Sequence, residues 1–235
     1  MADVRKNEAA LSAAEWQKFI AAIDRMHGMG IPAPRYRDFV LIHVQAMTTM
    51  AGMGWRVHTM RQMGMVGTNF LAWHRVYLRA FEKRLQVVDA SVTVPYWDWI
   101  ANPRIPPRLN RAADRERWGI TRKWSPQYMP TAAQLTAVTA LTRFAPFQRA
   151  LESLHGNVHI AVGGDDGSGT MAGAASPADP LFWLHHSNVD RIWAQWQDAG
   201  GARPTNGSET LQPPPIITGK VSAAVSIARL GYAYG

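Results

Sequence analysis

Two strongly apolar stretches of this sequence each carry histidine. One is FLAWHRVYL (70–78) and the other is DPLFWLHHSNVD (179–190). In the second stretch, Asp179 can cap a helix and Pro180 suits the first helical position. A helix that is apolar on most of its surface is buried in the protein. We therefore expect two core helices that bring imidazole rings into the interior.

A third segment carries His155 and His159 at a spacing of four residues. This spacing places both rings on one helix face, where they can hold one metal ion. Six of the eight histidines lie in or beside apolar helical segments, and a buried ring nitrogen without a partner costs roughly 1–3 kcal/mol. The chain has no cysteine, so the ligands must be nitrogen or oxygen. An all-imidazole site suits copper, zinc, iron or nickel, and the spacing alone does not choose among them.

The remaining histidines have simpler interpretations. His27 precedes a glycine in a helix-ending turn and is interpreted as structural. A lone inward histidine such as His43 is more often a hydrogen-bonded core residue than a ligand. Only the presence of the other histidines in apolar segments favours ligation. His185 and His186 point about 100° apart in a helix, so one of them is expected to bind the metal and the other to support it.

Caps and apolar spacing predict the secondary structure. A capping box at Ser12 and Glu15 opens the first helix. We expect helices over about 13–27, 36–47 and 70–89, a short one from 131, one that contains 147–155, and one from 180 to about 199. The segment 50–68 is predicted to be a loop that delivers His58, and 100–130 a long connection. The pattern predicts a mainly α protein in which a four-helix bundle core holds a metal centre, with long loops and little β structure.

Composition narrows the class of protein. With 235 residues and 47% hydrophobic content, the chain is predicted to form one globular domain over 1–235. The net charge is +8, but the basic residues are dispersed, and those of 104–123 are interpreted as a solvated flank, so no nucleic-acid partner is expected. No apolar run reaches membrane-spanning length. The N-terminus lacks an apolar signal core, which predicts a cytoplasmic location or export with a partner.

Four motifs, in this order, resemble the signatures of the tyrosinase family, the type 3 copper phenol oxidases. They are FLAWHRVYL (70–78), PYWDW (95–99), VHIAVGG (158–164) and DPLFWLHH (179–186). The closing LGYAY (230–234) also resembles the end of the bacterial catalytic domain. The resemblance spans most of the chain and implies a dinuclear copper centre that uses O2.

The resemblance also implies a ligand set. The first copper would be bound by His43, His58 and His74, and the second by His155, His159 and His186. His185 would then support its neighbours without binding. Many family members carry the second ligand of the first copper at the position of Met65, so His58, the only histidine between His43 and His74, is assigned this role instead.

The reaction implied is the oxidation of o-diphenols to o-quinones. The expected partners are small phenolic substrates and a protein that delivers copper. Gly156 stands where members with strong monophenolase activity often carry an asparagine that orients a water. This departure predicts weaker ortho-hydroxylation of monophenols. Glu152, one turn before His155, is a candidate base for the phenol proton, and an ion pair with an arginine is the alternative.

Other functions stay open, some within the family that the chain resembles and some outside it. They are a full tyrosinase with strong monophenolase activity, an o-aminophenol oxidase, an oxygen-binding dicopper protein, a structural metal-binding protein and a dinuclear zinc hydrolase. The hydrolase would normally show carboxylate ligands.

Arg75 follows His74, and Asp190 lies one turn after His186, so we also predict an ion pair between the two helices that keeps the half-sites in register.

Overall fold

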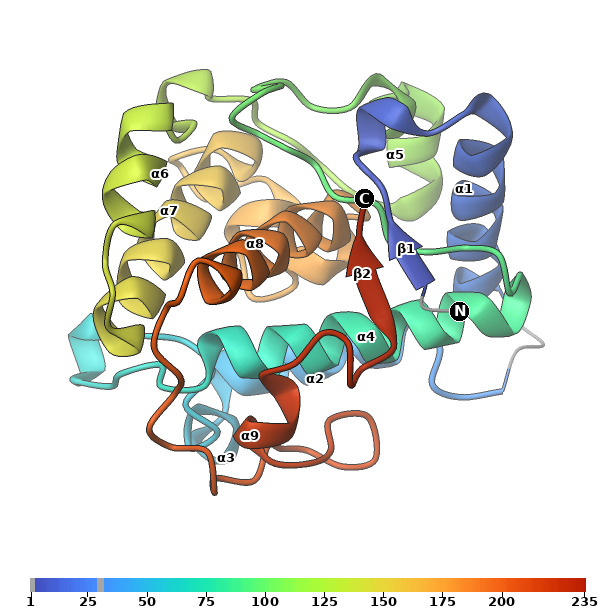
Figure 1. Ribbon diagram of the computed structural model, residues 1–235. Coiled ribbons are helices and arrows are strands. Elements are labelled where there is room, and N and C mark those ends of the chain that lie inside the picture. Colours follow the sequence, from blue (N-terminus) through green and yellow to red (C-terminus); the bar gives the residue numbers. More distant parts are fainter. Residues whose placement is uncertain (1–2, 29–31) are drawn as a thin grey trace.

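Long helices dominate the computed structural model, which describes residues 3–28 and 32–235 (Figure 1). The helices are α1 (Ala13–His27), α2 (Tyr36–Thr48), α3 (Met50–Met53), α4 (Phe70–Val88), α5 (Ala112–Trp118), α6 (Ala132–Thr139), α7 (Phe144–Gly163), α8 (Leu181–Asp198) and α9 (Val221–Ala224). Two short strands, β1 (Asp3–Arg5) and β2 (Tyr232–Tyr234), pair in parallel. The prediction of a mainly α protein with little β structure is confirmed.

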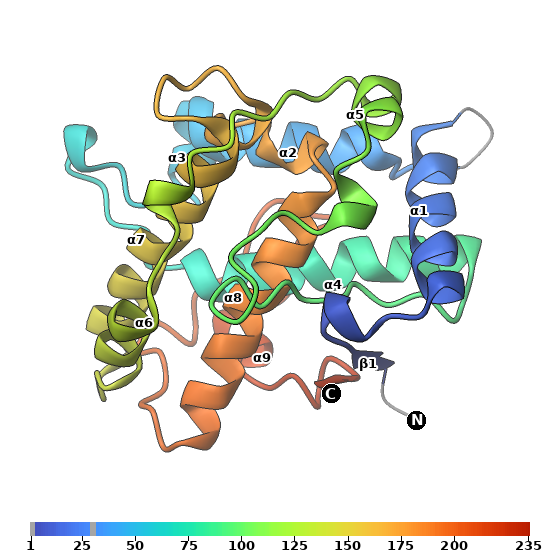
Figure 2. The ribbon, with the colours of Figure 1, turned by 90° about the horizontal axis from the view of Figure 1, so that it is seen from above.

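The core lies where α8 crosses α4 (Figure 2). The rings of Phe81 and Trp183 stack there, with centroids 3.6 Å apart and an interplanar angle of 1°. Tyr77 packs on the same indole and donates a hydrogen bond of 2.6 Å to the carbonyl of Phe39 in α2. Helices α2, α4 and α8 therefore share one aromatic interior, and a regular four-helix bundle that also includes α7 stays a prediction.

The predicted helix starts lie within two residues of those in the structure. Ser12 and Glu15 form a reciprocal capping box, and Thr131 does the same with Gln134 at the start of α6. At α8, the carboxylate of Asp179 accepts a hydrogen bond of 2.9 Å from the amide of Leu181. Local cap chemistry therefore fixes where these helices begin.

Two connections contain more structure than the sequence indicated. The segment 50–68, predicted as a loop, begins with the short helix α3 and includes a 3₁₀ turn at Arg61–Met63. The connection 100–130 contains α5, which buries Trp118 and ends at Gly119 with φ +64°. These helices are too short for an apolar period to show in the sequence.

One basic side chain of the predicted solvated flank is buried. Arg122 donates hydrogen bonds of 2.7 and 2.6 Å to the two carboxylate oxygens of Asp179, and neither side chain is more than 4% exposed. The interpretation of 104–123 as wholly solvated is therefore wrong at this position. Asp179 both accepts a hydrogen bond from the first residue of α8 and anchors the long connection.

The two ends of the described chain lie side by side (Figure 1). Val4 of β1 pairs with Ala233 of β2, and the next residue, Arg5, is fully buried. Strands of three residues give no periodic signal, so this sheet was not expected. Within the part of the chain that is described, no helix combines the length and apolar character needed to cross a membrane.

Candidate metal centre

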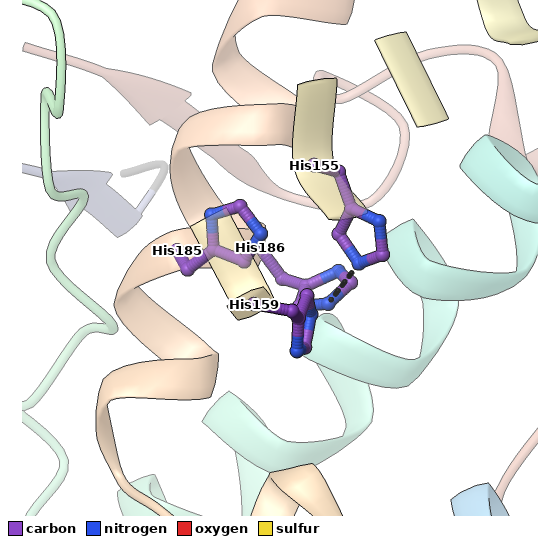
Figure 3. Close-up of side chains that lie close together, drawn as sticks. All are labelled: His155, His159, His185 and His186. Carbon is purple, nitrogen blue, oxygen red and sulfur yellow. Dashed lines mark hydrogen bonds between the residues drawn. The ribbon is translucent and has the colours of Figure 1, made fainter. Parts of the chain in front are cut away.

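Seven histidines gather in two groups. In each group, every residue offers one ligand atom and these atoms lie within 4.8 Å of one another. The first group contains His43 of α2, His58 of the following loop and His74 of α4. The second contains His155 and His159 of α7 with His185 and His186 of α8 (Figure 3). His27 lies outside both and stacks on Tyr36 at 4.0 Å, in line with a structural role.

The two groups face each other. The rings of His74 and His186 stack with centroids 4.3 Å apart at 16°, and those of His58 and His155 lie 6.1 Å apart. Metal ions held by the two groups would therefore be neighbours. This arrangement fits a dinuclear site.

Four of the rings are oriented by backbone carbonyls. The Nδ1 atoms of His43, His74, His155 and His159 lie 2.7, 2.8, 3.2 and 2.6 Å from the carbonyl oxygens of Ala174, Phe70, Glu152 and Met171. A carbonyl oxygen only accepts, so each Nδ1 carries the proton and each Nε2 presents a lone pair. Histidines that bind metals are commonly held in this way through the other ring nitrogen.

The Nε2 atoms need a partner. Those of His74 and His159 are buried and have no hydrogen-bond partner among the described residues. The Nε2 atoms of His155 and His186 point toward each other at 3.2 Å across the gap between α7 and α8 (Figure 3). A metal ion in each group satisfies these lone pairs together, so the residues fit two metals.

Burial keeps the rings neutral. Loss of hydration lowers the pKa of His43 and of His159 to about 4, in spite of their carbonyl hydrogen bonds. Burial and neighbouring imidazoles place the pKa values of His58, His74, His155, His185 and His186 well below the usual range. Metals bind the neutral form, so the folded chain presents binding-competent rings at neutral pH.

The donor set is entirely imidazole. In the described part of the chain, neither group includes an aspartate or glutamate. Dinuclear zinc hydrolases and di-iron bundles are built with carboxylate ligands, so this donor set disfavours both. It suits copper.

His185 and His186 have different surroundings. His186 contacts His74 of the other group, whereas the ring of His185 contacts Trp99 and stacks on His155 at 5.1 Å and 13°. His186 thus faces both groups. Among the histidines of the two groups, His185 makes ring contacts only with members of the second group, and it is fully buried.

A cavity of about 200 Å³ reaches the site. Four histidines of the two groups line it together with Met47, Gly156 and Met171. A Cβ atom added at Gly156 would meet nothing within 4 Å, so the cavity is open at this residue. The structure therefore places Gly156 beside the metal centre, where a side chain would face the space available to a substrate.

Glu152 contacts the loop that carries His58. Its two carboxylate oxygens accept hydrogen bonds of 2.7 Å each, from the amide and the hydroxyl of Thr59. One of these oxygens lies 3.9 Å from Nδ1 of His58. The role of Glu152 as a base stays a prediction, and Thr59, a polar residue in an aperiodic segment, gave no signal in the sequence.

The predicted pair between the histidine-bearing helices is confirmed. Nε of Arg75 donates to a carboxylate oxygen of Asp190, and both side chains are buried. The same guanidinium donates to the carbonyl of Val225 at 2.8 Å and stacks on the ring of Trp193 at 3.6 Å. Helices α4 and α8 are therefore tied together next to the site.

Comparisons with known proteins give the family. The model for the common central domain of tyrosinase matches residues 33–120 and 107–199. The tyrosinase of Streptomyces glaucescens is 33% identical, over 83% of this chain and 82% of that one. Two solved structures share the fold. A functional unit of octopus hemocyanin has a TM-score of 0.78 at 23% identity, covering 99% of this chain and 68% of that one.

The second solved structure that shares the fold is a polyphenol oxidase of Grenache (Vitis vinifera). It has a TM-score of 0.71 at 19% identity, covering 100% of this chain and 85% of that one. The family model spans the segments that carry both histidine groups. Fold, donor set and sequence agree. The chain belongs to the tyrosinase family of type 3 dicopper proteins.

Proposed function

We propose that this copper phenol oxidase uses O2 to oxidise o-diphenols to o-quinones and hydroxylates monophenols only weakly. The observation that carries the proposal is the pair of all-imidazole groups in ring contact, beside a cavity that is open at Gly156. Bound copper would supply the electron transfer and Lewis-acid chemistry. The chain holds the rings neutral, orients them and admits a small phenolic ring.

The proposed ligands follow the two groups. We assign His43, His58 and His74 to the first copper, and His155, His159 and His186 to the second. His186 is preferred over His185 because it contacts the ring of His74 in the other group. His185 is assigned a supporting role, since it stacks on His155 and contacts Trp99.

The substrate preference rests on Gly156. An unperturbed phenol has a pKa near 10 and is mostly neutral at pH 7, so hydroxylation of a monophenol needs a group that takes its proton. Glycine has no side-chain acceptor to orient a water for this purpose. Glu152 is our candidate for the proton acceptor, because its carboxylate lies beside His58, which lines the cavity.

The test compares matched substrates on the copper-loaded protein. Initial rates are measured with tyrosine and with its ortho-hydroxylated form, and o-aminophenol serves as a third substrate. We expect rapid oxygen uptake with the diphenol, and slow or lagging uptake with tyrosine. Comparable rates on tyrosine and the diphenol would contradict the preference, and no uptake with any of the three would contradict the enzyme.

A copper-delivery partner is a further part of the proposal. Four of the six proposed ligands are no more than 6% exposed, so an ion must reach rings that are largely shielded from solvent. We expect metal-free protein to take up Cu(II) slowly from a simple salt. The uptake is measured by elemental analysis after gel filtration, and complete loading within seconds of mixing would argue against the need for a partner.

A further inference from the structure

We propose that Gln148 and Glu152 of α7 position His58, so that the helix which carries two ligands of the second copper also builds the first copper site. The inference rests on the proposed assignment of His58 as a ligand. It concerns the contacts that these two side chains make within the protein, apart from the proposed role of Glu152 as acceptor of the substrate proton. They act through the loop between α3 and α4.

His58 differs from the other proposed ligands because it lies on a loop. The base of this loop is closed by Asn69, whose amide donates to the carbonyl of Arg56 at 2.9 Å and whose side chain donates to that of Trp55 at 3.0 Å. These bonds hold the ends of the loop. They leave the middle, with His58, to be held by other contacts.

Glu152 holds the residue next to His58. Its carboxylate accepts both hydrogen bonds that Thr59 can donate, from the amide and from the hydroxyl, at 2.7 Å each. The hydroxyl oxygen in turn accepts from the amide of Gly67 at 3.1 Å. The carboxyl group is only 11% exposed, and both of its hydrogen bonds to Thr59 are short.

Gln148 holds the returning side of the same loop. Its side-chain amide donates to the carbonyls of Gly67 and Thr68 at 3.0 and 3.2 Å, and its oxygen accepts from the amide of Leu71 at 3.2 Å. A Cβ atom at Gly67 would come within 2.7 Å of the His58 backbone, so the two sides of the loop are in close contact. Gln148 and Glu152 lie one turn apart and share a face of α7.

Copper binding by the first group should therefore depend on α7, the helix that carries two ligands of the second copper. Nε2 of His58 lies 3.2 Å from that of His43, and this distance is set by the loop that α7 grips. Loss of these contacts should weaken binding of the first copper. It should leave binding of the second unchanged, because the ligands of the second lie on α7 and α8. Changes to residues that orient metal ligands typically cost roughly 10–100-fold in metal affinity.

The experiment measures copper retention. Thr59→Val removes the hydroxyl but keeps the carboxylate of Glu152, and Gln148→Met removes the side-chain hydrogen bonds at similar size. Ser153→Ala is the matched control, because Ser153 is an exposed neighbour of Glu152 whose hydroxyl donates to the carbonyl of Arg149. Each protein is loaded with Cu(II) and dialysed against a chelator. Copper per chain is followed with time, together with the melting temperature of the metal-free form.

We expect the control to release copper like the wild type, and Thr59→Val and Gln148→Met to release one copper per chain roughly 10–100-fold more easily. Thr59→Ser should restore retention. Wild-type retention in both variants, or equal loss of both coppers with a large fall in melting temperature, would overturn the inference. The readout does not involve phenol oxidation. A failure of the proposed reaction can therefore be distinguished from a failure of this inference.

Discussion

Two buried polar clusters lie next to each other on α4 and α8, and they are satisfied in opposite ways. One is the pair of histidine groups, to which α4 contributes His74 and α8 contributes His186. The other, the ionic cluster, starts at the neighbouring Arg75 and, one turn further along α8, at Asp190. The ionic cluster consists of Arg5, Arg75, Arg79, Glu82, Asp190, Tyr232 and Tyr234.

The ionic cluster is paired by groups of the protein, both among its own members and with nearby carbonyls. Arg5 donates two hydrogen bonds of 2.9 Å to the carboxylate of Glu82, and Tyr232 and Tyr234 donate to Asp190 at 2.6 and 2.5 Å. The histidine groups instead leave lone pairs buried without a donor. A buried cluster that is paired within the protein stabilises the fold. One that leaves matched acceptors unpaired fits a metal ion that binds after folding. The predictions below test this division.

The largest effect is expected from Asp190→Asn. Removing one partner of a buried pair leaves the guanidinium of Arg75 uncompensated, which typically costs roughly 3–5 kcal/mol. Asp198→Asn, at the exposed end of the same helix, is the control and should cost little. The free energy of unfolding is measured with urea. An Asp190→Asn protein with unchanged melting temperature and copper content would show that the ionic cluster does not hold the helices in register.

Loss of either copper alone should have a smaller effect on stability than loss of the Asp190 charge. A ligand at 100 times its Kd stabilises the folded state by about 2.7 kcal/mol per site. Chelation should therefore lower the unfolding free energy, and His159→Ala should lose about half of the copper-dependent part. Equal stability of loaded and metal-free wild type would mean that the buried imidazoles already satisfy one another.

Acid should erase the difference between wild type and Asp190→Asn. Burial raises the pKa of Asp190, but the charges of Arg75 and Arg5 outweigh it, and the folded pKa lies below its usual value. The stabilisation is therefore complete above the unfolded pKa of about 3.9 and is lost as the pH falls through the folded pKa. Urea unfolding of both metal-free proteins from pH 7 downward checks this. A difference that stays constant at the lowest pH would exclude ionised Asp190 as the source.

The smallest change in stability is expected from Gly156→Asn, which belongs to the histidine side of the comparison. The new side chain would enter open space, and asparagine is a slightly better helix former than glycine. We expect an unchanged melting temperature and a higher ratio of monophenol to diphenol rates. A ratio equal to that of the wild type would show that Gly156 does not limit hydroxylation.

The sequence predicted what local patterns determine. The helix at 13–27 and its cap, the buried helices around His74 and His186, and the Arg75–Asp190 pair all follow from spacing along one or two helices. The contacts that join distant segments left no such pattern. They include the β1–β2 pairing, the Arg122–Asp179 bridge and the grip of Glu152 on Thr59. Each depends on where the chain returns, which only the packed core decides.

The central claim is that the two histidine groups each hold one copper. The most direct measurement is elemental analysis of copper-reconstituted wild-type protein, after unbound metal has been removed by gel filtration. The neutral, carbonyl-oriented rings of both groups predict two coppers per chain. A value of one or fewer would contradict the dinuclear centre.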